Sequence, residues 1–339
     1  MSKVRKVEFL SVGGGIGSFC WVDTLRIHGV PANKIAVISP YKKPYTQLKK
    51  YCDAIKLTED EKFRSDSGSR PDNFWGFPGY GLSEALDELK NHKFTKALKL
   101  IFQLFFEPFI FGYYSPTAGR VYKAIDRESE RISWRKCLIS GYATNLTKLS
   151  NGSFKINYNQ NKSIIANVVH LSLGHSQIST SENTINAYEI TDKKWEFITK
   201  SGGVVMVIGR GASAQKIIDY LLKFKNIKIV SLHRETEKTN DFRGLTQKRF
   251  LSWRLQQFNW PKAVFGGGLM DKIDPIWSLP SATPDKKWLT KLKKAIKVGK
   301  YRITKTPIKA DFVINCSGFI ENVFYHKFYS KLCKNTIYL

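Results

Sequence analysis

Two stretches of the chain carry the same order of hydrophobic and polar positions. Residues 204–208 are continuously apolar, which is typical of a fully buried strand. After the glycine-containing residues 209–214, apolar residues recur on one helical face, at Ile217, Ile218, Leu221 and Leu222. A second apolar run follows at 227–232. The pattern therefore predicts a strand, a tight turn, a helix and a further strand.

The amino-terminal part of the chain repeats this order. Residues 6–12 alternate into an apolar strand, and residues 13–18 lead to a helix with apolar positions at Phe19, Val22, Leu25 and Ile27. The next strand is expected at 34–38. Strands that alternate with helices are typical of parallel sheets. We therefore expect an α/β protein with two βαβ units.

The pattern predicts smaller elements elsewhere. Short alternating runs at 138–169 indicate a small antiparallel insert. The most apolar run, 98–114, is interrupted by charges, so we expect a buried helix ending near Glu107, with an apolar lid or a membrane-surface patch as the alternative. Further expected elements are a helix at 115–134, a polar connector at 179–201, and a basic amphipathic helix with a strand at 288–303.

Composition changes this picture mainly through charge. The chain has 339 residues, enough for about two domains, and its apolar content of 42% is ordinary for a globular protein. Its 55 Lys and Arg against 28 Asp and Glu give a net charge of +27. Because the basic residues are scattered over expected helix surfaces, we predict no specific nucleic-acid partner. Peripheral membrane contact is possible on this composition and is not favoured.

The cysteines and histidines suggest no metal or dithiol centre. The five cysteines are isolated and form no CxxC pair. His170 and His175 lack a third ligand, so no metal site is expected. The amino terminus runs into a strand, not into a signal-peptide apolar region. A reducing, cytoplasmic setting fits best.

The second glycine turn has the residue types that a diphosphate needs. Gly209 permits the tight turn, Gly211 lets the backbone approach the anion, and small Ala214 lets the helix pack closely on its strand. Arg210 and Ser213 complete the turn. Arg234, just after the second strand, suits the 2′-phosphate of NADP. A purely structural βαβ unit without a nucleotide is the alternative.

The first glycine turn suits the diphosphate of FAD, which is usually bound at the amino terminus. Its expected contacts are Gly13, Gly14, Gly15, Gly17 and Ser18. Ser18 stands where the third glycine of the pattern is usual. Ser39 stands where an acidic residue commonly holds the ribose, and it supplies a single hydroxyl instead.

Together with two further segments, these turns resemble those of the two-dinucleotide-binding-domain flavoproteins, which include flavin monooxygenases and pyridine-nucleotide-dependent reductases. Residues 169–175, which contain Gly174, resemble the segment by which that family leaves its flavin domain. Residues 311–318, which end at Gly318, resemble the segment by which it returns. The resemblance implies two Rossmann-like domains with three-layer parallel sheets. It implies an FAD-binding domain at 1–178, an NADP-binding domain with an aromatic insert at 200–305, and a return to the FAD domain at 306–339.

The resemblance implies an NADPH-dependent flavoprotein oxidoreductase, monooxygenase-like, that uses FAD and NADPH on a small organic substrate. Arg70, Asn73 and Trp75 combine polar donors with aromatic rings and are the expected substrate contacts, with an ordered surface loop as the alternative. No residue is singled out as catalytic acid or base. Because residues 319–339 lack the family's Gly-Asp pair, the return segment is expected to be shortened. A flavin-dependent reductase or halogenase-like enzyme, or a non-catalytic redox sensor, remains as an alternative.

Overall fold

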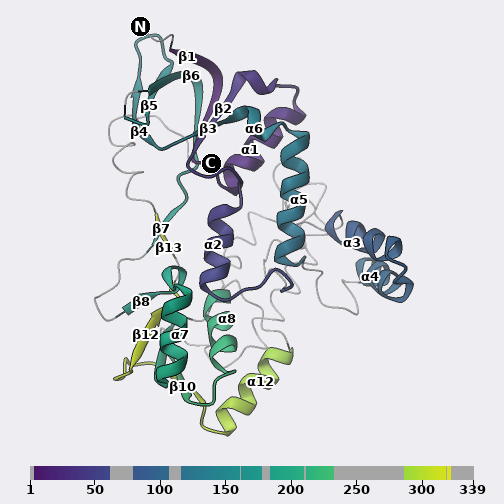
Figure 1. The fold of residues 1–339 in the computed structure, drawn as a ribbon, viewed down its shortest axis with the longest axis vertical. Coiled ribbons are helices and arrows are strands. Elements are labelled where there is room, and N and C mark those ends of the chain that lie inside the picture. The colour runs from purple at the N-terminus through teal and green to yellow at the C-terminus, as the bar shows by residue number, and fades with distance from the viewer. Residues whose placement is uncertain are drawn as a thin grey trace, which may run out of the picture. The chain divides into compact units, whose positions relative to one another are not determined.

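The computed structural model describes residues 4–61, 79–106, 116–160, 162–177, 184–209, 211–232, 286–317 and 319–321. The chain divides into two compact units (Figure 1). The first comprises Met1–Asp53, Gly119–Ile178 and Phe319–Leu339, and the second comprises Ala54–Ala118 and Ser179–Gly318. Each unit contains its own sheet.

The first unit is built on a six-stranded sheet of order β3-β2-β1-β6-β5-β4. Its strands are β1 (Arg5–Val12), β2 (Ile35–Ser39), β3 (Leu138–Ser140), β4 (Ala143–Lys148), β5 (Phe154–Tyr158) and β6 (Lys162–Leu171). The strands β3, β2, β1 and β6 pair in parallel. Strand β5 pairs antiparallel with β6, and β4 pairs antiparallel with β5. The predicted antiparallel insert is therefore confirmed, although β3 belongs to the parallel part. The strands β7 (His175–Gln177) and β13 (Phe319–Glu321) form a separate antiparallel pair.

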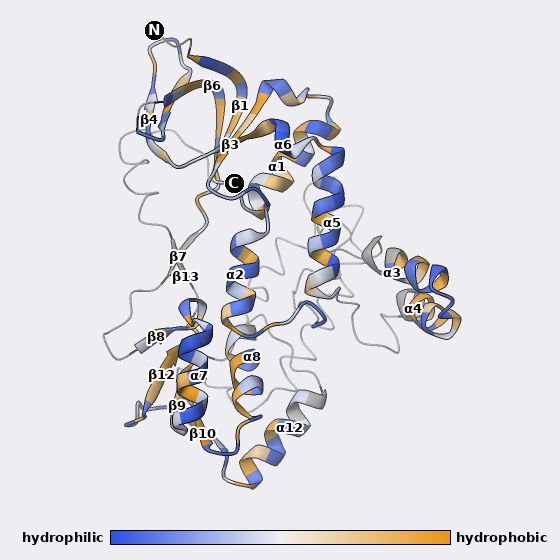
Figure 2. Ribbon diagram, viewed as in Figure 1, coloured by the Kyte–Doolittle hydropathy of each residue, from blue (hydrophilic) through white to orange (hydrophobic). Residues whose placement is uncertain are grey.

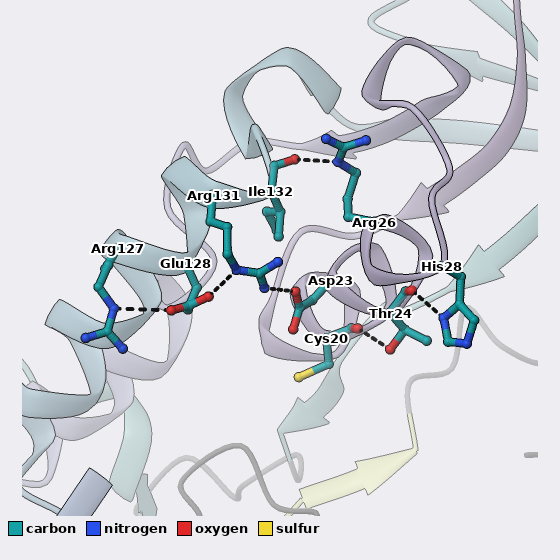
Figure 3. A network of polar contacts seen from close by, with 9 residues as sticks. All are labelled: Cys20, Asp23, Thr24, Arg26, His28, Arg127, Glu128, Arg131 and Ile132. Carbon is teal, nitrogen blue, oxygen red and sulfur yellow. Dashed lines mark hydrogen bonds and ion pairs between the residues drawn. The ribbon is translucent and has the colours of Figure 1, made fainter. Parts of the chain in front are cut away.

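The helices of the first unit are α1 (Ile16–Ile27), η1 (Ala32–Lys34), α2 (Thr46–Ala54), α5 (Ala118–Arg131) and α6 (Trp134–Cys137). In α1, Phe19 and Val22 are buried as expected, but Ile27 is 66% exposed, so its assignment to the apolar face is wrong. The reason is angular, because Ile27 lies about 80° around the helix from Phe19. Figure 3 shows how α5 is held to α1: the Arg131 guanidinium binds both Asp23 and Glu128.

The second unit has a five-stranded, fully parallel sheet of order β11-β10-β9-β12-β8. Its strands are β8 (Thr184–Asn186), β9 (Gly203–Ile208), β10 (Ile227–Leu232), β11 (Tyr301–Thr304) and β12 (Phe312–Asn315). Its helices are η2 (Ala187–Glu189), α7 (Asp192–Ser201), α8 (Ala212–Leu221) and α12 (Lys286–Lys297). Apolar residues of α7, α8 and α12 share one core with β9 and β10. The predicted α/β class with parallel-dominated sheets is confirmed.

The polar connector expected at 179–201 is wrong for residues 184–201. They form β8, η2 and α7, and Thr191 caps α7 by accepting the Lys194 N–H. Only Trp195 and Ile198 of α7 are fully buried, and its remaining surface is polar except for Phe197, which is 56% exposed. A helix with so narrow an apolar stripe is easily taken for a loop from its composition. The indole N–H of Trp195 donates to the carbonyl oxygen of Ala54 (2.7 Å), so α7 is tied to the residue at which the second unit begins.

The expected buried helix at 98–107 is present in part. The helices α3 (Gly79–Lys90) and α4 (Phe94–Phe106) pack on each other as a hairpin, and residues 107–115 lie outside the described part of the chain. Leu98 is 64% exposed, so the expectation of burial is wrong at this position. Among the described residues, no helix combines the length and the apolarity needed to cross a bilayer.

Candidate functional site

The first glycine turn is closed from both sides by neighbouring strands. Gly13 follows β1 with φ of +97°, a conformation that favours glycine. Its N–H donates to the Ile38 carbonyl oxygen (3.0 Å) at the end of β2. A Cβ at Gly13 would overlap the Ser172 carbonyl oxygen. Gly13 is therefore required by the turn itself.

Gly15, two residues further on, faces open space. It is the N-cap of α1, with φ −83° and ψ −167°, and no side chain caps it. No atom of the described residues lies within 4 Å of a Cβ built at Gly15. The first N–H groups of a helix have no intrahelical acceptor and attract anions. The end of α1 at Gly15 is thus uncapped and approachable, which is the property that a bound phosphate needs.

Ser18 and Gly17 lie in the first turn of α1. The Ser18 hydroxyl donates to the Gly13 carbonyl oxygen (2.5 Å) and lies 2.8 Å from the Ser11 hydroxyl. Ser18 is fully buried, so the side chain that replaces the usual third glycine braces the turn. A Cβ at Gly17 would lie 2.9 Å from the Ser172 Oγ.

The hydroxyl network extends to His170 on β6. The Ser11 Oγ lies 3.0 Å from the His170 Nδ1, and the imidazole stacks on the Trp21 ring with centroids 4.9 Å apart. Burial lowers the pKa of His170 from 6.5, which favours the neutral ring. The network is local to the turn and holds no second titratable group among its described members, so it stabilises the turn without suggesting a proton relay.

Ser39, the expected ribose contact, is 1% exposed. Its hydroxyl accepts the Tyr41 N–H (3.1 Å), and its side chain lies against Gly14, where a Cβ would overlap it. The structure therefore places Ser39 under the turn, at the carboxyl end of β2. Gly14 is needed for this close approach.

The second glycine turn has the same construction. Gly209 has φ of +112°, and its N–H donates to the Leu232 carbonyl oxygen (3.1 Å). A Cβ at Gly209 would lie 2.8 Å from the Cys316 carbonyl oxygen. Gly211 is the N-cap of α8, with φ −69° and ψ −176°; within the described part of the chain, no side chain caps it and no atom lies within 4 Å of its Cβ position.

Each of the two turns is supported by an equivalent backbone hydrogen bond within its own unit. The Ser172 N–H donates to the Val12 carbonyl oxygen (2.8 Å), and the Cys316 N–H donates to the Ile208 carbonyl oxygen (2.8 Å). In each unit, therefore, the residue just past the strand on the far side of the turn covers the first glycine. Burial raises the pKa of Cys316 to about 12, so this thiol is a packing group and not a nucleophile.

Ser213 and Ala214 occupy the first turn of α8. Ala214 is fully buried, which allows the close packing of helix on strand that its small size predicts. The Ser213 hydroxyl lies 2.6 Å from the Tyr188 hydroxyl of η2. Sequence reasoning missed Tyr188, because it lies in the segment that was taken for a connector.

A basic residue also lies at the carboxyl edge of the second sheet. Leu232 at the end of β10 is in register with Thr304 at the end of β11. Lys305 follows β11 on this edge and is exposed. The Thr306 N–H donates to the Thr304 Oγ1 (3.2 Å), which turns the chain at this point. Sequence reasoning missed Lys305, because only the strand order reveals that β11 neighbours β10.

The remaining expected site residues are placed as follows. Gly174 has φ of +72°, and no atom of the residues that the structure describes lies within 4 Å of its Cβ position. Arg70, Asn73, Trp75, Arg210, Arg234 and Gly318 lie outside the described residues. Within the described part of the chain, no group of three or more His, Cys, Asp or Glu is arranged to hold a metal ion.

No known protein-family profile matches the chain, and no curated protein matches it in sequence. Solved structures do match. The ornithine N-hydroxylase of Kutzneria sp. 744 aligns over 93% of this chain and 81% of its own, with a TM-score of 0.57 and 11% identity. The ornithine hydroxylase of Pseudomonas aeruginosa aligns over 94% and 84%, with a TM-score of 0.54 and 10% identity. The cyclohexanone monooxygenase of Rhodococcus sp. Phi1 aligns over 93% and 72%, with a TM-score of 0.50 and 12% identity.

These likenesses extend over nearly the whole chain and concern its fold. The chain therefore has the fold of the two-dinucleotide-binding-domain flavin monooxygenases, as its two glycine turns and its two crossover segments indicated.

Proposed function

We propose that the protein is an NADPH-dependent flavoprotein oxidoreductase, monooxygenase-like, that acts on a small organic substrate. The observation that carries this proposal is the shared construction of the two turns. Each has a first glycine closed by a backbone carbonyl and a later glycine that opens an uncapped helix N-terminus. Two such turns in one chain fit two dinucleotides better than one.

In this proposal FAD binds at the first turn and NADPH at the second. The FAD contacts are Gly13, Gly14, Gly15, Gly17, Ser18, Ser39 and Gly174. The NADPH contacts are Gly209, Arg210, Gly211, Ser213, Ala214, Arg234 and Gly318. The open space at Gly15 and Gly211 supports the fit, since a diphosphate needs close access to backbone N–H groups. The Kutzneria enzyme, of the same fold, was solved with reduced FAD, NADP+ and L-ornithine.

Coenzyme choice is assigned to the carboxyl edge of the second sheet. Arg234 is two residues beyond Leu232, where a 2′-phosphate is held in folds of this kind. The register of β10 with β11 supports Lys305 as a second cation for the same phosphate. Both residues add charge-assisted contacts that NADH cannot use.

When bound, the two cofactors supply hydride transfer from NADPH to the flavin and then electron transfer to oxygen or an organic acceptor. The protein's part is to hold the diphosphates and to orient the rings. We assign substrate contact to Arg70, Asn73 and Trp75. The setting we propose is the cytoplasm, because the four cysteines in the described residues are all free.

One observation favours a second candidate, a non-catalytic nucleotide-binding redox sensor. Ser39 is buried and accepts the Tyr41 N–H, so the position of the usual ribose carboxylate offers a weaker contact. A weaker ribose contact would suit a protein that exchanges its flavin or binds NADPH alone. A flavin-dependent reductase with another acceptor uses the same cofactors and differs only in its product.

The test is the absorption spectrum of the purified protein, recorded without oxygen before and after NADPH is added. We expect a flavin spectrum that NADPH bleaches, and peroxide or oxygenated product when air is admitted. A colourless protein that binds NADPH favours the sensor. A protein that binds neither cofactor refutes both candidates.

Two matched variants separate the turns. Valine accepts the backbone conformations of both Gly15 and Gly211, so neither variant should disturb folding. Gly15→Val should yield protein without flavin. Gly211→Val should yield protein that keeps flavin and is no longer bleached by NADPH. If Gly211→Val lost the flavin and Gly15→Val kept it but was not bleached by NADPH, FAD would bind at the second turn and NADPH at the first.

A further inference from the structure

The α3–α4 hairpin presents an exposed apolar face. Five of its large apolar side chains are more than two-fifths exposed: Leu82 (44%), Leu86 (56%), Phe94 (58%), Leu98 (64%) and Phe102 (48%). Single exposed apolar residues are normal, whereas a contiguous group marks an interaction surface. Figure 2 shows the alternating hydrophobic and hydrophilic bands of both helices.

The exposed residues form one stripe on each helix. In α3, Leu82 and Leu86 are four residues apart, and in α4, Phe94 and Leu98 are four residues apart. Residues at this spacing lie on the same side of a helix. Phe102 extends the stripe of α4 by a further four residues.

Both stripes lie on the same side of the hairpin. The buried Ala85 and Ala97 mark the side on which the two helices pack. Leu86 follows Ala85, and Leu98 follows Ala97, so each stripe is rotated from the packed side by about 100° in the same sense. Because the helices are antiparallel across the three-residue connection 91–93, equal rotations bring both stripes to one face. We call this surface, formed by Leu82, Leu86, Phe94, Leu98 and Phe102, the hairpin face.

Both basic and acidic residues lie near the hairpin face. Lys90 continues the stripe of α3, and Lys99 follows Leu98 at its edge; both are exposed. The acidic Glu88 lies on the packed side, is buried, and accepts an ion pair from Lys96 at 2.6 Å. Helix α4 contains Lys96 and Lys99 and no acidic residue. Asp87 follows Leu86 on α3 and is half-buried. The exposed charges that border the apolar face are therefore the two lysines, which we call its cationic edge, in a chain of net charge +27.

We propose that the hairpin face docks the protein on an anionic membrane surface. A helix with Phe and Leu on one side and Lys on the other lies in the plane of a bilayer interface, with its apolar side among the acyl chains. Lysines at the edge reach the headgroups of anionic lipids while their alkyl stems remain on the apolar surface. No spanning helix is needed for this mode of binding.

Charge favours a membrane over a second copy of the chain. A second copy would bring two chains of net charge +27 together and would supply no excess of negative charge for Lys90 and Lys99. Anionic lipid headgroups would neutralise these lysines instead. Self-association through the face is therefore a separate outcome that the experiment distinguishes.

The test is co-sedimentation of the full-length protein with vesicles, compared between phosphatidylcholine alone and a mixture of phosphatidylcholine and phosphatidylglycerol. We expect binding to the mixture that weakens as salt is added. Leu98→Glu should lower the partition constant by about tenfold or more, since it replaces inserted apolar surface by a charge. The matched control is Ile27→Glu, because Ile27 is 66% exposed and lies outside the hairpin.

A second pair of variants tests the cationic edge with the apolar stripes intact. Lys90→Glu combined with Lys99→Glu should lower binding to the anionic vesicles more than the same change at two exposed lysines of α12, Lys293 and Lys294. Equal loss in both pairs means that net charge alone drives binding, and it overturns the proposal. The proposal is also overturned if the wild type ignores both vesicle types, or if it forms a dimer that Leu98→Glu dissolves.

Discussion

The contrast between Gly209 and Gly211 offers the sharpest test of the site. The two glycines are two residues apart, yet the structure gives them different tasks. Gly209 has φ of +112°, and its Cβ position lies 2.8 Å from the Cys316 carbonyl oxygen. Gly211 has φ of −69°, and its Cβ position lies more than 4 Å from every atom with which it is compared among the described residues. The same substitution, glycine to alanine, should therefore damage the fold at one position and ligand binding at the other.

The expected magnitudes follow from these geometries. Gly209→Ala places a side chain in a glycine-favouring conformation against a backbone oxygen, which costs about 2–4 kcal/mol of the free energy of unfolding. Gly211→Ala raises the free energy of unfolding by about 0.4–1 kcal/mol, because alanine restricts the unfolded chain. It lowers it by a similar amount because alanine is a poorer N-cap, so the net effect on stability is close to zero. The added Cβ instead overlaps the bound diphosphate. This weakens the binding free energy of NADPH by about 1–3 kcal/mol, which raises its Kd by about five- to 150-fold.

Urea unfolding measures the first quantity, and fluorescence titration with NADPH measures the second. Gly209→Ala should unfold at clearly lower urea. Gly211→Ala should unfold with the wild type and bind NADPH more weakly. A folded Gly211→Ala that binds NADPH as tightly as the wild type would show that the open space is not where the diphosphate lies. Equal destabilisation by both variants would refute the geometric argument.

Three further outcomes are expected. Arg234→Ala should weaken NADPH by about ten- to 150-fold and NADH little, because a charge-assisted contact contributes about 1.5–3 kcal/mol; equal losses in Kd for the two coenzymes would rule it out as the selector. Because burial lowers the pKa of His170 from 6.5, the unfolded chain binds a proton there first, so the free energy of unfolding should fall as the pH drops below 6.5. His170→Gln should remove that part of the fall in urea titrations, and an unchanged pH dependence would contradict the assignment. Cys316, with its pKa raised to about 12, should resist iodoacetamide in the native protein while partly exposed Cys20 reacts; peptide mapping that finds Cys316 labelled first would contradict its burial.

Local sequence was sufficient for the glycine turns. A strand, a turn and a helix that follow one another directly are specified by neighbouring residues, and glycine positions with special backbone angles are visible as glycines. Thus β9, Gly209 and α8 occur where the pattern predicted them. The basic amphipathic helix and the strand expected within 288–303 were predictable for the same reason, since α12 buries Trp288 and Leu292 at helical spacing and β11 follows at Tyr301–Thr304.

Elements with a weak hydrophobic signal were not predictable in this way. Helix α7 buries only Trp195 and Ile198 completely, so its sequence is dominated by its polar surface. The exposure of Leu98 in α4 could not be predicted either, because the sequence does not show whether other parts of the chain cover an apolar residue.

The sequence alone determined the two glycine turns and the class of fold to which they belong. Only the tertiary structure decided which residues close those turns. Ser172 covers Gly13 and Cys316 covers Gly209, and each pair is separated by more than one hundred residues in the sequence. It also set Lys305 beside the end of β10 and the exposed side of the hairpin. The physical reason is that turn geometry depends on bonded neighbours, whereas closure, exposure and charge proximity depend on which distant segments the packed strands bring together.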